Sequence, residues 1–330
     1  MPGKQKAKQR LREIAATALH YSGASRMLQI GDEHPWRILM YHRVVRLNEL
    51  PYAIQPGMYV TPETFEMQMK YLAEHAQVVP LDDLARDIVQ GKTIAPRTVA
   101  VTFDDGWVDT YTHAFPILKR YSIPATIFLV TSFIGTTETL WTDKVTLALM
   151  ALREEKHYLQ NACSRIKEMT GIEPAFCAEI TKILNTGPAE ELPEQFDALI
   201  EQLKRSSLKE RKTIVSGLVN LAKEFTTLKI PRSFLSWDEV KEMTRDGVYF
   251  GSHSHKHYPL TELSEVQLTD DIENSFQVFR EKGIAPSAVF CYPGGDYNEL
   301  VQHVLAKHEI RFALTTAKTS NLNTLPHWSA

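Results

Sequence analysis

The chain has 330 residues, of which 43% are hydrophobic and 23% charged, and this composition is typical of a soluble globular protein that can bury a full core. Its net charge of -3 gives no reason to expect nucleic acid as a partner, and its three scattered cysteines do not form a disulfide framework. Because it also lacks a signal peptide and any apolar run near the ~20 residues of a membrane span, we expect a cytoplasmic protein.

Residues 1–35 are predicted to form a basic amphipathic helix and a linker. Apolar residues recur there at helical spacing, alongside five cations: Lys4, Lys6, Lys8, Arg10 and Arg12. Such a helix could rest on the inner membrane surface, with its cations on anionic headgroups. It could also dock on the following domain, and we favour this second interpretation because the apolar stripe is small and rich in alanine.

From residue 36 onward, short apolar runs alternate with segments of helical periodicity. The predicted strands are 37–42, 98–103, 125–130, 248–251, 288–292 and 311–315, and 78–81 is a candidate short strand. This alternation favours βα units around a parallel sheet. Between about 144 and 232 the strand runs vanish and helix formers dominate, so we expect a helical insertion that interrupts a domain spanning 36–330.

Side chains that can bind a metal or act as an acid or base recur where these strands end. Asp104 and Asp105 directly follow one strand, and His42 and Tyr292 stand at the ends of two others. In barrels of parallel strands the active site is built at that face. Because side chains alternate along a strand, one aspartate could ligate a metal while the other acts as a base. The alternative is ordinary Asp-Gly turn chemistry.

Three histidines within five residues form the second signal. If the chain turns helical after Gly251, His253 and His257 lie one turn apart on the same face. Two imidazoles and a carboxylate from another strand would then make a facial set for a metal ion. His255 would point elsewhere, and a solvated histidine-rich loop remains the alternative.

Together these motifs resemble the polysaccharide deacetylase family (NodB-homology domain, carbohydrate esterase family 4), in the type found in exopolysaccharide pathways. The resemblance rests on Thr-Phe-Asp-Asp-Gly at 102–106 and Gly-Ser-His-Ser-His-Lys-His at 251–257. Residues 39–44 and 290–297 are similar to two further family motifs. The resemblance implies an α/β fold, a distorted (β/α)7 TIM-like barrel with a helical insertion.

The family's chemistry is metal-dependent removal of an acetyl group, which gives an amine and acetate. The resemblance implies that Asp105, His253 and His257 bind a divalent metal, usually Zn²⁺, and that Asp104 is the general base. It also implies that a backbone N–H near Tyr292 stabilises the oxyanion. Trp141 resembles a family residue near the substrate groove, where it could stack on a sugar ring, although a buried tryptophan is an equally good interpretation.

Two departures from the family pattern stand out. Cys291 replaces an arginine that orients the base in many members, and the late leucine–histidine motif that supplies the general acid has no clear match. His327 and His42 are the two candidates for that acid. The expected substrate is an N-acetylated sugar, polysaccharide, or lipid-linked or nucleotide-linked precursor. An amidohydrolase acting on a non-sugar amide, and a degenerate carbohydrate-binding or scaffold protein, remain alternatives; the sequence indicates no oligomeric state.

Overall fold

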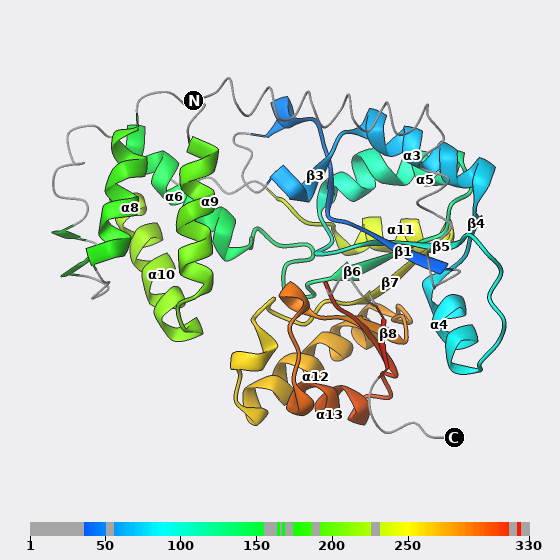
Figure 1. Cartoon of the computed structure of the whole chain (residues 1–330). Helices are drawn as coiled ribbons and strands as arrows, with labels where there is room; N and C mark the ends of the chain where they lie inside the picture. Colours follow the sequence, from blue (N-terminus) through cyan, green and yellow to red (C-terminus); the bar gives the residue numbers. More distant parts are fainter. Residues whose placement is uncertain are drawn as a thin grey trace.

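The computed structural model of the chain describes residues 36–50, 56–154, 164–165, 167–168, 174–186, 192–225, 232–316 and 322–324. The predicted N-terminal helix within 1–35 and the candidate acid His327 both lie outside the described residues. Within them, the α/β fold class is confirmed (Figure 1).

The central sheet is parallel and its strands lie where the sequence predicted them, although the candidate short strand at 78–81 is only the two-residue β4 (Gln77–Val78), which begins one residue earlier. It contains β1 (Trp36–Tyr41), β4 (Gln77–Val78), β5 (Thr98–Phe103), β6 (Ala125–Leu129) and β7 (Val248–Ser252). The strand order is β1-β5-β6-β7, and β4 pairs with the start of β5. Every residue of β5 and β6 is buried, as expected for parallel strands that are covered on both faces.

A second sheet completes the domain. It consists of β8 (Val289–Cys291) and β9 (Phe312–Leu314), which are parallel, and β10 (Leu322–Thr324), which is antiparallel to β9. Two short strands, β2 (Arg43–Val44) and β3 (Tyr59–Val60), form a separate pair. Among the described residues no strand pairing joins β7 to β8, so the strands form two sheets rather than a closed ring. The expected barrel is therefore strongly distorted.

Helices cover both sides of the strands (Figure 1). They are α3 (Pro62–His75), α4 (Leu81–Val89), α5 (Phe115–Arg120), α11 (Trp237–Arg245), α12 (Glu265–Lys282) and α13 (Glu299–Lys307). The predicted capping box at the start of α11 is present, because Ser236 and Glu239 each bond the other's backbone N–H. A five-residue π-helical turn, η3 (Thr110–Ala114), precedes α5 and contributes to the predicted helical stretch there.

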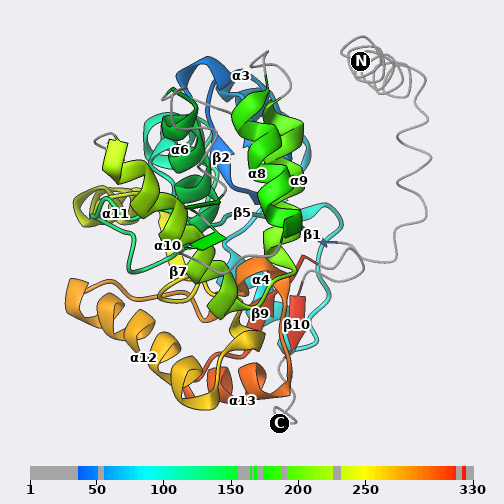
Figure 2. The ribbon, with the colours of Figure 1, turned by 90° about the vertical axis from the view of Figure 1, so that its left-hand side faces the viewer.

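In the described part of the range where the insertion was expected lie the helices α6 (Trp141–Glu154), α8 (Pro174–Asn185), α9 (Leu192–Lys204) and α10 (Leu208–Phe225). They pack around an apolar cluster of their own that includes Leu149, Phe196 and Leu218. The four lie together on the left in Figure 1 and in front of the strands in Figure 2. The division of the chain into domains stays a prediction. No helix in the described ranges combines the length and apolar character needed to cross a membrane.

Candidate metal centre and catalytic site

The turn after β5 places the two adjacent aspartates. Gly106 has a φ of 83°, and a Cβ on it would lie 2.7 Å from Leu129 Cδ2, so only glycine fits where the turn passes β6. Asp105 itself has a left-handed backbone, with a φ of 72°. A non-glycine residue held in this region is strained, and such strain is often concentrated at functional sites.

The structure brings the three predicted metal ligands together. Asp105 Oδ1 lies 3.2 Å from His257 Nε2 and 3.5 Å from His253 Nε2. One ligand atom from each residue lies within 4.8 Å of the other two. A carboxylate and two imidazoles from two strand ends therefore converge on one point.

The helical turn predicted after Gly251 is wrong. Residues 253–259 form an irregular loop that turns through left-handed backbones at Ser254 and His257, with φ of 67° and 55°. The Ser254 hydroxyl accepts a hydrogen bond from the His257 backbone N–H at 2.9 Å. This closure brings the rings of His253 and His257 to 4.9 Å without a helix. His255 does point elsewhere, as predicted, and its Nδ1 lies 2.9 Å from the Thr131 hydroxyl.

The hydrogen bonds around the cluster fit a bound divalent metal. Asp105 Oδ2 accepts a bond from the Trp107 indole at 2.9 Å, whereas the buried Oδ1 has no hydrogen-bond partner among the described residues. His253 Nδ1 lies 2.8 Å from the carbonyl of Cys291, which can accept its N–H and leave the Nε2 lone pair facing the cluster. Such outer partners fix the tautomer and orientation of metal-binding side chains.

The charge states also suit a metal. Burial alone would raise the pKa of Asp105, but the neighbouring His257, His42 and His253 outweigh burial and hold that pKa well below its usual range. Burial lowers the pKa of His253, against the opposing effect of Asp104. An ionised carboxylate and a neutral imidazole are the forms that bind metal ions.

Asp104 lies beside this cluster with partners of its own. Its Oδ2 is 3.8 Å from His42 Nε2, and its Oδ1 accepts a weak hydrogen bond from Cys291 Sγ at 3.4 Å. Thus Cys291 contacts the candidate base, although a thiol cannot supply the charge of the arginine that it replaces. Burial, reinforced by Asp104, raises the pKa of Cys291 well above its usual value, so Cys291 is a protonated thiol.

A second group of potential ligands, Asp104, His253 and Cys291, also lies within 4.8 Å. Metal ions bind the thiolate rather than the thiol, and the raised pKa of Cys291 disfavours that form. We therefore assign the candidate metal centre to Asp105, His253 and His257.

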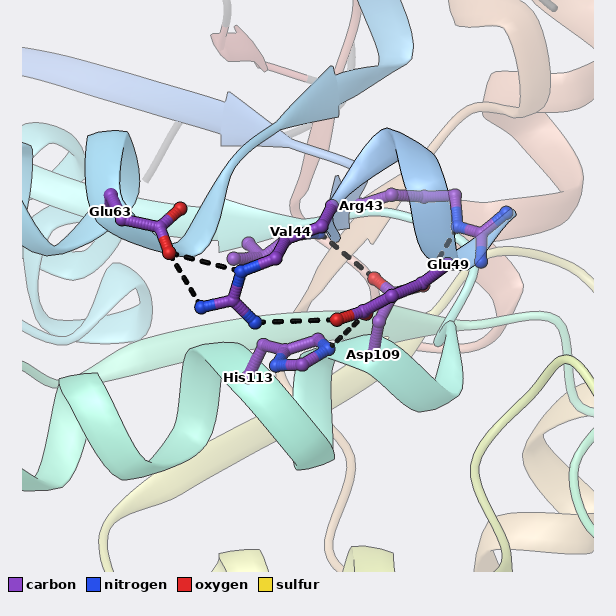
Figure 3. Close-up of polar contacts among 7 residues, drawn as sticks. Arg43, Val44, Glu49, Glu63, Asp109 and His113 are labelled. Atoms are coloured by element: carbon purple, nitrogen blue, oxygen red, sulfur yellow. Dashed lines mark hydrogen bonds and ion pairs between the residues drawn. The ribbon is translucent and has the colours of Figure 1, made fainter. Parts of the chain in front are cut away.

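The strand β2, which directly follows His42, is anchored by a largely buried ion pair. Arg43 Nε donates to Asp109 Oδ2 at 2.7 Å, and the Val44 backbone N–H donates to Asp109 Oδ1 at 2.9 Å (Figure 3). The Arg43 guanidinium also lies 4.2 Å from the centre of the Trp107 ring. Arg43 thereby ties β2 to the residue that orients Asp105. No sequence motif predicted a role for Arg43, Asp109 or Trp107.

An exposed network surrounds this anchor. Glu49 and Glu63 both accept hydrogen bonds from Arg46, and His113 Nε2 lies 2.9 Å from Glu49 Oε2 (Figure 3). Ion pairs at the surface contribute little to stability individually. We therefore attribute the positioning of β2 chiefly to the largely buried pair of Arg43 and Asp109.

Two predicted residues lie outside the metal cluster. The backbone N–H of Tyr292 donates to the Leu314 carbonyl at 3.1 Å, so this particular donor is not free to hold an oxyanion. The Tyr292 ring stacks on Tyr297, and its buried hydroxyl has no hydrogen-bond partner in the described structure. Trp141, at the start of α6, lines a cavity of about 670 Å³ that His257 also lines. A contact between Trp141 and a sugar stays a prediction.

Comparisons with known proteins agree with this geometry. The family model for polysaccharide deacetylase matches residues 91–313. The putative polysaccharide deacetylase YxkH of Bacillus subtilis is 29% identical over 173 residues, which are 51% of this chain and 57% of that protein. The poly-beta-1,6-N-acetyl-D-glucosamine N-deacetylase of Staphylococcus epidermidis is 40% identical over 79 residues, 24% of this chain and 27% of that protein. The chain thus spans about half, or less, of the length of these curated relatives.

A solved structure shows the same fold. The deacetylase PplD of Streptococcus pyogenes, in complex with acetate, aligns with a TM-score of 0.50 and 19% identity over 85% of this chain and 83% of that chain. The family match covers well over half of the sequence and contains the paired aspartates and the histidine cluster. This chain belongs to the polysaccharide deacetylase family.

Proposed function

We propose that the protein is a metal-dependent N-deacetylase that hydrolyses the acetamide of an N-acetylated sugar to an amine and acetate. The observation that carries this proposal is the convergence of Asp105, His253 and His257 beside the buried carboxylate of Asp104. Family membership and the matched relative named as a poly-N-acetylglucosamine deacetylase support the same reaction.

The site's donor set fits a divalent cation, and we propose Zn²⁺. One carboxylate oxygen and two imidazole nitrogens leave coordination positions open, as in catalytic zinc sites. When bound, the metal would polarise the acetyl carbonyl and make water a better nucleophile.

Two side chains carry out the two proton transfers of the reaction, Asp104 as the base and His42 as the acid. Asp104 takes a proton from the attacking water as the general base, because its carboxylate stands next to the cluster without belonging to it. His42, whose Nε2 is 3.8 Å from Asp104 Oδ2, donates a proton to the departing amine. The other candidate acid, His327, lies outside the described residues and stays a prediction.

Acetate release tests the proposal. Oligomers of N-acetylglucosamine and simple cyclic amides should be offered to the metal-loaded protein, to the Asp104→Asn variant and to the His42→Ala variant. Asp104→Asn should retain the metal and lose roughly 10²–10⁴-fold in rate, the usual contribution of general acid–base catalysis. Sugar binding without hydrolysis in any form would instead support a scaffold, and hydrolysis of cyclic amides alone would support the amidohydrolase alternative.

The place of the reaction in the cell also remains a proposal. We propose a cytoplasmic protein whose residues 1–35 could contact the inner membrane surface. Fractionation of cells that express the chain with and without these residues would test this contact. A loss of membrane association on their removal would support the contact, and an unchanged distribution would support docking on the following domain.

A further inference from the structure

The cavity beside the metal centre lies between the insertion and the strand domain. Its volume is about 670 Å³, and it is lined by residues of α6 and α10 and by the loop that follows β7. Trp141 and Tyr258 contribute aromatic surface, and His257 belongs to both the cavity and the metal cluster. Figures 1 and 2 show the helices of the insertion that form one side of it.

The exposure of the ligands indicates that this cavity leads to the metal centre. The side chain of His257 is 20% exposed, whereas those of His253 and Asp105 are 3% and 2% exposed. Because His257 also lines the cavity, a substrate that reaches the metal centre on the side of His257 contacts the cavity. The part of that substrate beside the acetylated sugar would be bound there.

The charged side chains that line the cavity are mostly positive. It includes four cations, Lys144, Arg211, Lys212 and Lys256, and one acid, Glu138. Two of these cations, Lys144 and Arg211, already form ion pairs with acidic side chains. Lys144 Nζ lies 2.6 Å from Glu138 Oε2, and Arg211 pairs with Glu262 and donates to three backbone carbonyls.

The other two lysines form no ion pair within the part of the chain that the structure describes. Among the described residues, neither Lys212 on α10 nor Lys256 in the loop after β7 forms an ion pair, and both are exposed. Lys212 Nζ lies 3.8 Å from the centre of the Tyr258 ring, so an aromatic contact holds one ammonium group at the cavity. Two cations that line the same cavity attract a ligand of the opposite sign.

We propose that this cavity binds an acidic group of the substrate, a phosphate or a carboxylate, next to the sugar whose acetamide reaches the metal centre. The proposal rests on the proposed deacetylase function and names its substrate class as anionic N-acetylated glycans. A phosphate would come from a sugar linked to a nucleotide or a lipid, and a carboxylate from a uronic acid in the glycan itself. A neutral glycan would offer neither ammonium group an ion-pair partner.

Three probes and a matched pair of variants test this inference. The probes are N-acetylglucosamine 1-phosphate, a hyaluronan tetrasaccharide that carries carboxylates, and the neutral trimer of N-acetylglucosamine. The double variant Lys212→Gln/Lys256→Gln removes both cations, and Lys70→Gln/Lys241→Gln removes two exposed lysines on α3 and α11 as a control. Both kcat and KM for acetate release are measured on the metal-loaded full chain, and thermal melting verifies folding.

The wild type should favour one anionic probe over the neutral trimer by about tenfold or more in kcat/KM. The cavity variant should lose about tenfold or more on that probe, chiefly through KM, and less than about twofold on the neutral trimer; the control should match the wild type. Added salt should weaken the anionic preference. The favoured probe identifies the source of the acidic group. Equal rates on all probes, or an unchanged cavity variant, would overturn the inference while leaving the deacetylase function intact.

Equilibrium titration with the same probes separates the two proposals if no acetate is released. Binding of an anionic probe to the wild type, weakened in the cavity variant but not in the control, would support the acidic subsite and contradict the deacetylase function. Binding that is absent, or the same in all three proteins, would contradict the subsite as well.

Discussion

Trp107 and Asp105 are joined by a hydrogen bond of 2.9 Å from the indole Nε1 to the carboxylate Oδ2. This bond occupies the oxygen that points away from the histidines and leaves Oδ1 directed at His253 and His257. Trp107 itself is fixed by stacking on Phe234, with ring centres 4.5 Å apart, and by the Arg43 guanidinium, which lies 4.2 Å from the centre of its ring. The tryptophan that closes the aspartate motif is therefore a positioning residue for the candidate ligand.

Trp107→Phe should weaken metal binding. The substitution keeps an aromatic ring in the core but removes the indole N–H, so Asp105 can rotate, and losses of about 10- to 100-fold in metal affinity accompany the removal of such outer-shell bonds. Competition with a chromophoric chelator measures the affinity. Trp237→Phe, a change on α11 outside the metal cluster, is the control, and equal affinities in the two variants would show that the bond has no positioning role.

Gly106→Ala should destabilise the fold by about 1–3 kcal/mol, because an added methyl group meets Leu129 and the residue must keep a positive φ. Gly283→Ala separates these two causes. Gly283 also has a positive φ, 68°, but a Cβ there meets no atom within 4 Å. Urea unfolding of both variants should therefore give the larger loss for Gly106→Ala, and equal losses would exclude a steric role for Leu129.

Much of the fold could be predicted because the strong signals are local. The run at 98–103 is rich in β-branched and apolar residues and forms β5 with those bounds, and Ser236 caps α11 as its capping-box spacing indicates. The short strands β2, β3 and β10 could not be predicted, because two or three residues carry no periodicity and owe their extended form to their pairing partners.

The candidate site also has features that the sequence could predict and features that it could not. Its ligands were recognisable from residue type and motif, and the structure does bring them together. The loop geometry was predicted wrongly, because the spacing of His253 and His257 also suits a loop whose left-handed residues close the same distance. The engagement of the Tyr292 N–H by Leu314 and the convergence of Lys212 and Lys256 depend on contacts between distant segments, which no local pattern reveals.

Asp143 on α6 should make stability depend on pH. Burial raises its pKa to about 6, although Arg43 and the Thr139 hydroxyl oppose the shift. The unfolded chain has an aspartate pKa near 3.9, so the folded state binds more protons between about pH 4 and 6 and loses stability as the pH rises through that window. Asp143→Asn cannot ionise and avoids this loss.

Denaturant unfolding of metal-free protein tests the prediction, since a metal ion would add its own charge near Asp105. The stability of Asp143→Asn relative to the wild type should rise by about 1–3 kcal/mol between pH 4 and pH 7. Asp270→Asn, at an exposed position on α12, should show no such change. A relative stability of Asp143→Asn that stays constant with pH would contradict the prediction.

The metal content of the purified protein tests the central claim most directly. Elemental analysis should be made on the wild type and on the Asp105→Ala, His253→Ala and Asp104→Asn variants, each after incubation with zinc and removal of the excess. We expect near-stoichiometric divalent metal in the wild type and in Asp104→Asn, and its loss in the other two variants. A wild type that holds no metal even after added zinc would contradict the proposed centre and the hydrolytic mechanism built on it.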